Sequence, residues 1–163
     1  MALWTAEFYA GVGTRLRAVI EGAPEKLDPA VLAVLRQAIA QEMGAYYASV
    51  FERYAFRERM REFFERYDLL LSPTLPTAAV GVGLDTPETA TDRTIVSWVY
   101  YTYPFNLTGQ PAASLPVGFT SAGAPVGLQV VAGLHDEATV FAFCGAYERA
   151  HGAHLDARPA VAA

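Results

Sequence analysis

The segment that decides the fold is Tyr103–Phe119, YPFNLTGQPAASLPVGF. Its part NLTGQPAASLP contains two helix-breaking prolines, Pro111 and Pro116, and Gly109 offers a backbone conformation that other residues rarely adopt. After Pro111 the chain becomes an apolar run that is typical of a buried strand. The segment therefore predicts a crossing from a helix to a strand. Such a crossing can be purely structural, or it can form one wall of a site.

Two more strands are expected around this crossing. DLLLSPT (68–74) contains a short apolar run ended by Pro73, which predicts a fully buried strand. AASLPVGF (112–119) and VGLQVVAGL (126–134) predict two strands joined by the turn-forming stretch TSAGAP. Helices combined with three short strands predict an α/β fold, with helices packed on a small mixed β-sheet that looks like part of a larger one.

The first third of the chain has helical patterns. Thr5 is expected to cap a helix that reaches about Ile20, with Gly22 just beyond its end. Asp28 is expected to cap a second helix that has Pro29 at its first position. A longer, charge-rich helix is predicted over 45–67. The large side chains expected to face inward from this helix are Tyr47, Val50, Phe51, Tyr54, Phe63 and Phe64.

Two helices are expected in the second half. Asp92 can cap one that runs to about Tyr100. Asp136 is expected to cap the other, which should end near Gly152. The apolar stripe predicted for this last helix consists of Val140, Phe141, Cys144 and Tyr147.

The composition limits the function classes. A length of 163 residues predicts a single domain over 1–163, mainly helical in 1–67 and containing the strands in 68–163. Apolar residues form 53% of the chain, which favours an interface or a missing neighbour. A net charge of −5 argues against direct nucleic-acid binding, and the apolar runs are too short to cross a membrane. A cytoplasmic protein without an internal disulfide is expected, since Cys144 is the only cysteine.

The tract from about Tyr46 to His154 resembles the C-terminal portion of the amidase signature family, which includes amidases and the A subunit of glutamyl-tRNA(Gln) amidotransferase. The resemblance rests on four motifs in the family's order: YDLLLSPTLPT, PFNLTGQPAASLPVGF, APVGLQVVAG and HDEATVFAFCGAYERA. Residues 1–45 resemble the preceding helical region more loosely. The resemblance implies a larger family sheet and hydrolysis of carboxylic amides through an acyl-serine intermediate, without metal or organic cofactor.

The family's catalytic serines and lysine belong to its N-terminal part. The five serines of this chain include no adjacent pair and lie in no glycine-rich tract, and its only lysine, Lys26, is expected at the surface. Ser114 has no base near it in sequence, so it is interpreted as structural. No residue of this chain is assigned a catalytic role, and the chain alone is expected to be inactive.

Several residues before and within the crossing are candidates for the wall of a substrate pocket. Asn106 and Gly109 can instead serve a buried turn, and the aromatic residues can be core. The region where amidotransferase A subunits hold an acidic residue for glutamine carries Val99, so a glutamine-specific site is not expected here. An aromatic, uncharged lining suits an apolar or aryl amide better. The candidate pocket residues are Trp98, Tyr101, Thr102, Asn106 and Gln110.

A metal site is not expected. His151, His154 and Asp156 lack the spacing of a zinc-binding helix, and a histidine near a helix C-terminus is favoured by the helix dipole.

Three interpretations of the whole chain stay open. It can be the C-terminal segment of an amidase that is truncated here. It can be a non-catalytic module that associates with itself or a partner. It can also be one part of a split amidase, with the serines and lysine supplied by a separate N-terminal polypeptide.

Overall fold

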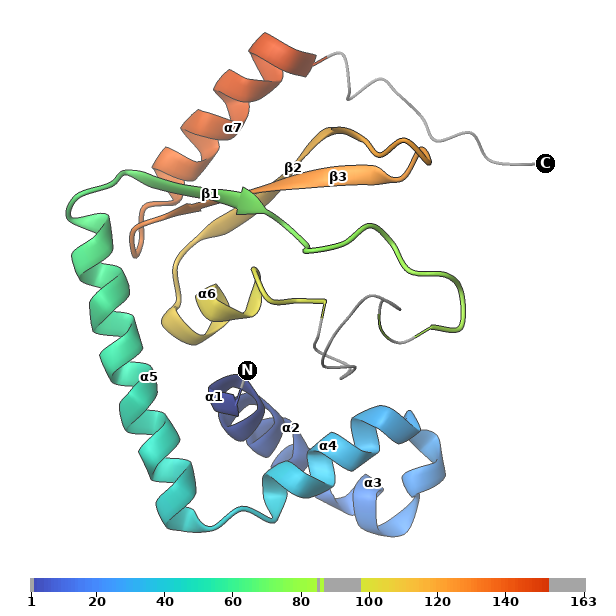
Figure 1. Ribbon diagram of the computed structural model, residues 1–163. Coiled ribbons are helices and arrows are strands. Elements are labelled where there is room, and N and C mark those ends of the chain that lie inside the picture. Colours follow the sequence, from blue (N-terminus) through green and yellow to red (C-terminus); the bar gives the residue numbers. More distant parts are fainter. Residues whose placement is uncertain (1, 85, 87–97, 153–163) are drawn as a thin grey trace. The chain divides into compact units, whose positions relative to one another are not determined.

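The computed structural model describes residues 2–84, 86 and 98–152 (Figure 1). These form an α/β fold, which confirms the predicted class, and they divide into two compact units, Met1–Arg57 and Glu58–Ala163. The single-domain organisation expected from the sequence stays a prediction. The helix expected after Asp92 lies mostly outside the described residues.

The first unit is helical. It contains α1 (Ala2–Trp4), the π-helical segment Thr5–Tyr9, α2 (Ala10–Arg15), α3 (Arg17–Gly22), the 3-10 turn Pro24–Lys26 and α4 (Pro29–Ile39). The prediction that Thr5 caps the first helix is wrong, because the preceding Trp4 already has helical backbone angles. Gly22 is the last residue of α3 and does not follow it.

Helix α4 begins as predicted. The Asp28 side chain accepts hydrogen bonds from the backbone N–H groups of Ala30 (2.8 Å) and Val31 (3.1 Å). These N–H groups lie in the first turn, so no preceding turn of the helix offers them a carbonyl. α4 packs closely on α2 because Gly13 has no side chain there. A Cβ at Gly13 would lie 2.5 Å from Ile39 Cγ2.

Helix α5 (Met43–Phe64) differs from its prediction in what it buries. None of its side chains is fully buried, and Tyr47, Phe51 and Tyr54 are more than half exposed. The inward orientation predicted for these three is therefore wrong, although Phe63 and Phe64 are half-buried. Helical periodicity identifies an apolar stripe, but it carries no information about whether another element covers it.

The second unit contains β1 (Leu69–Pro73), α6 (Tyr103–Thr108), β2 (Ala112–Phe119), β3 (Pro125–Ala132) and α7 (Glu137–His151). The strand order is β1-β3-β2, and the predicted hairpin joins β2 to β3. Both pairings are antiparallel, so the described sheet is not the mixed sheet that we expected. β1 is also not fully buried: it is an edge strand, and Leu71 is 46% exposed.

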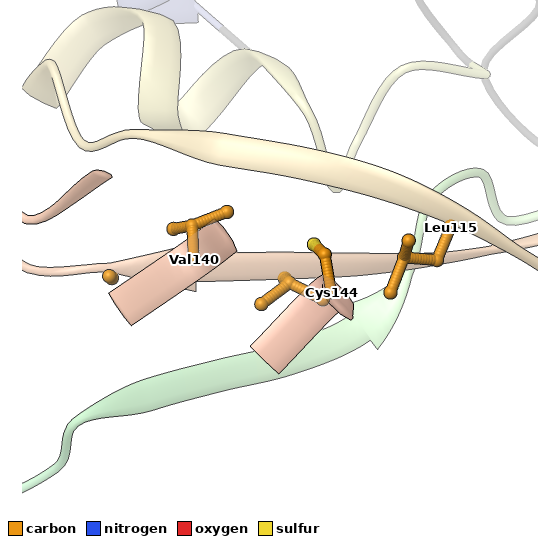
Figure 2. Packing of buried hydrophobic residues seen from close by; sticks show 5 residues of the cluster. Leu115, Val140 and Cys144 are labelled. Carbon is orange, nitrogen blue, oxygen red and sulfur yellow. The ribbon is translucent and has the colours of Figure 1, made fainter. Parts of the chain in front are cut away.

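Helix α7 covers one face of the sheet (Figure 1). Asp136 caps it as predicted, accepting from the Thr139 N–H at 3.3 Å. Figure 2 shows Leu115 of β2 directed toward Val140 and Cys144 of α7, and Val130 and Ala132 of β3 complete this buried cluster. Phe141 is 73% exposed, contrary to prediction, because adjacent residues of a helix point in different directions and Val140 is the one that faces the sheet. Phe143 packs on the cluster instead.

Candidate functional site

The sheet face away from α7 is polar along one row. Ser72, Gln129 and Ser114 are paired across β1, β3 and β2. Alternation along β3 places Gln129 on this face while its neighbour Val130 lies in the α7 cluster. Gln129 is buried, and its amide nitrogen donates to Ser72 Oγ (3.0 Å) and to the Tyr101 carbonyl (2.7 Å). The bond to Ser72 links β3 to β1, and the bond to Tyr101 holds the segment before α6 against the sheet.

A pair of hydroxyl groups extends this row. Thr74 Oγ1 and Ser114 Oγ lie 2.6 Å apart, and either can be the donor. Gly127 makes room for them, since a Cβ there would lie 2.7 Å from both oxygens. The glycine in this strand therefore marks a close approach of side chains to the backbone.

Helix α6 and the turn after it position Gln110. Gly109 ends α6 in the left-handed conformation (φ 86°), and its N–H donates to the Phe105 carbonyl at 2.7 Å. This confirms the special backbone predicted for Gly109. The next residue, Gln110, is only 6% exposed. Among the described residues, neither its amide nitrogen nor its amide oxygen has a hydrogen-bond partner.

Two cavities meet at the hydroxyl pair. The smaller, of about 380 Å³, is lined by Gln110, Gln129, Thr102, Asn106 and the two hydroxyl residues. The larger, of about 780 Å³, is lined mainly by apolar groups of residues 75–80, by Trp98 and by the β2–β3 hairpin. Thr74 and Ser114 line both cavities. The arrangement can bind an elongated ligand that has one polar and one apolar end.

Four of the five candidate pocket residues line these cavities. Thr102, Asn106 and Gln110 line the smaller one, and Trp98 lines the larger. Tyr101 does not line either of them, and contributes its carbonyl to Gln129. Asn106 lies within α6 and is exposed, so it does not serve a buried turn. Their contact with a substrate stays a prediction.

The sequence analysis missed Thr74, Gly127 and Gln129, and it interpreted Ser114 only as structural. The available signal was Gln129 itself, an amide inside the otherwise apolar strand GLQVVA, because a buried polar group requires partners. The Ser114 hydroxyl is bonded to another hydroxyl and not to a base.

The remaining reactive groups are not among the lining residues of the two cavities. Lys26 is exposed, as predicted. Burial in the α7 cluster raises the pKa of the Cys144 thiol, and the nearby negative charge of Glu148 raises it further. The thiol therefore stays protonated at neutral pH. In the part of the chain that the structure describes, no three His, Cys, Asp or Glu side chains gather as metal ligands would. His154 and Asp156 lie outside that part.

Comparison with known proteins places this fold in a family. The Amidase family model matches residues 21–141, which is most of the chain and begins earlier than the motifs alone indicated. The chain therefore belongs to the amidase family, as its motifs predicted.

Individual relatives are much longer than this chain. It is 39% identical to the A subunit of the glutamyl-tRNA(Gln) amidotransferase of Oceanobacillus iheyensis, over 57% of this chain and 18% of that protein. It is 38% identical to the corresponding protein of Geobacillus stearothermophilus, over 68% of this chain and 22% of that protein. A crystal structure of an amidase superposes with a TM-score of 0.83 and 27% identity, over 93% of this chain and 35% of the amidase.

The chain thus spans about a fifth of its curated relatives and about a third of that solved amidase. Among the helices of the described residues, none combines the length and apolarity needed to cross a membrane.

Proposed function

We propose that this chain acts as the C-terminal segment of a carboxylic amide hydrolase of the amidase family. In that role it contributes three strands to the family's larger sheet and one wall of the substrate pocket. The two cavities that meet at Thr74 and Ser114 carry this proposal, because they lie beside the segment that the family resemblance assigns to the pocket. The proposal includes a cytoplasmic location and a small amide as substrate.

The chain alone is proposed to lack amidase activity. A serine hydroxyl needs a neighbour that takes its proton before it can attack an amide. In the described residues Ser114 is paired with Thr74, and the only lysine is in a surface turn far along the sequence. The serines and lysine of the family would come from an N-terminal amidase part, either as a separate polypeptide or as the rest of a longer chain.

A fluorophosphonate probe for activated serines tests this proposal, with a complete amidase as the positive control. We expect no covalent mass increase on the purified chain and labelling of the control. Co-expression with an N-terminal amidase polypeptide should then restore labelling and hydrolysis of an anilide substrate. Denaturation-sensitive labelling of the chain alone would refute its inactivity, and failure of every complemented pair would count against the amidase role.

A second candidate is a non-catalytic module that associates with itself. The outer edges of β1 and β2 have no strand partner among the described residues, and open edges pair readily with other chains. Sedimentation at several protein concentrations separates the two candidates. A dimer that resists dilution would favour the module, whereas a monomer that binds an N-terminal amidase polypeptide would favour the split enzyme.

A further inference from the structure

The smaller cavity contains an amide group whose hydrogen-bonding capacity is unused. Both polar atoms of the Gln110 side chain are buried, and the described residues provide no partner for either. A buried donor or acceptor without a partner is destabilising, because it has lost its hydrogen bonds to water. A bound group that both donates and accepts would pair with the nitrogen and the oxygen of Gln110 at once, and binding would recover this cost.

The surroundings of Gln110 favour an uncharged group. The smaller cavity is lined by amides, hydroxyls and apolar side chains, and no charged side chain contributes to its wall within the described residues. A carboxylate or an ammonium group would lose its hydration there without meeting an opposite charge. A neutral group loses much less hydration, so the cavity should discriminate by charge.

The hydroxyl pair supplies a further donor at the junction of the cavities. Thr74 and Ser114 each carry one hydroxyl hydrogen, and the bond between them uses only one. The other hydrogen is available to a ligand that passes from one cavity to the other. Gly127 keeps this position open, since a Cβ would displace both oxygens.

The larger cavity suits an apolar extension of the same ligand. Its wall includes Leu75, Val80, Trp98 and Pro116, and an aromatic or aliphatic body of moderate size fits about 780 Å³. We infer that Gln110 is a selectivity residue: the smaller cavity binds an uncharged polar group that donates and accepts hydrogen bonds, and the larger cavity binds the apolar body attached to it. The inference rests on the proposed function only for the assignment of these cavities to a substrate pocket.

Three probes of matched shape test the selectivity on the chain as it exists. Phenylacetamide is neutral, phenylacetate is anionic and 2-phenylethylamine is cationic at pH 7. We expect phenylacetamide to bind at least about tenfold more tightly than either charged probe in titrations followed by NMR, since tenfold corresponds to one good hydrogen bond. The side-chain amide signals of Gln110 should shift as phenylacetamide saturates.

Two variants locate the effect. Gln110→Leu removes both unpaired atoms, so it should fold with an unchanged or higher Tm and bind phenylacetamide about tenfold more weakly. Gln37→Leu makes the same change at an exposed position of α4 and should leave binding unchanged. Because the wild-type Gln110 signals report directly, a variant that fails to fold would not prevent the test.

The inference is overturned if the three probes bind equally, if none binds, or if phenylacetamide saturates without moving the Gln110 signals. These outcomes are independent of the proposed function. Restored hydrolysis on complementation without probe selectivity would reject the role of Gln110 alone, whereas selective binding without restored hydrolysis would reject the amidase role alone.

Discussion

Replacing Gly127 by alanine should destabilise the second unit because it forces apart the hydroxyl pair. The new Cβ would lie 2.7 Å from Thr74 Oγ1 and Ser114 Oγ, and 3.2 Å from Thr74 Cβ. Overpacking of this kind costs about 1–3 kcal/mol, and loss of the hydrogen bond between the hydroxyls adds about 1 kcal/mol. We therefore expect a loss of about 2–4 kcal/mol in the free energy of unfolding.

Urea unfolding followed by circular dichroism measures this loss, and the Tm should fall by about 3 °C for each kcal/mol in a chain of this size. Gly44→Ala is the matched control, because a Cβ at Gly44 meets no atom within 4 Å. Repeating Gly127→Ala in a Thr74→Ala, Ser114→Ala background should reduce its cost to below about 1 kcal/mol, since the crowded oxygens are gone. An equal cost in both backgrounds would refute the explanation.

Three further predictions test other parts of the fold. Glu7→Gln should stabilise the first unit relative to the wild type, and this gain should grow as pH rises above 4.5. Burial raises the pKa of Glu7 although Arg53 Nη1 lies 3.2 Å from its carboxylate, so the wild type loses stability as pH rises through the raised pKa. A difference in urea midpoints that does not change with pH would contradict this. Asp28→Ala should cost about 1 kcal/mol through the lost helix cap, measured the same way, and no change would exclude the cap as a stabilising contact. Val140→Ala should lower the free energy of unfolding by about 1–3 kcal/mol, whereas Phe141→Ala at the exposed neighbouring position should lower it by less than about 0.5 kcal/mol. The reverse order would show that α7 turns its other face to the sheet.

The sequence predicts well those elements whose cause is local. Asp28 and Asp136 were identified as caps because an acidic side chain before a helix bonds the nearby N–H groups whatever the rest of the fold does. The hairpin between β2 and β3 was predicted for a similar reason, since a short turn joins two apolar runs. The amidase motifs likewise identified the family, which the comparison confirmed.

The sequence predicts poorly what depends on a distant neighbour. Phe51 belongs to a helical apolar stripe but is 66% exposed. The prediction failed because periodicity does not reveal whether another element covers the stripe. The candidate site shows the same limit. Gln110 was identified from its place in a motif, but its unpaired amide is a property of the folded surroundings, and the Thr74–Ser114 contact connects residues that are 40 positions apart in the chain. Only the folded sheet brings them together.

The position of β3 in the centre of the sheet has a consequence for the order of folding. β3 pairs with β2 through a tight turn, but its partner residues in β1, such as Leu69 opposite Ala132, are separated by a long stretch of chain. Closing a loop of roughly 60 residues costs about 2 kcal/mol more than closing one of about six. We therefore expect the hairpin to form first and β1 to dock last, so that in pulse-labelling hydrogen exchange the β1 amides gain protection after those of β2. Simultaneous protection would contradict this order. Until β1 docks, one side of β3 offers unpaired backbone groups, and a nascent chain would be most exposed to mispairing there.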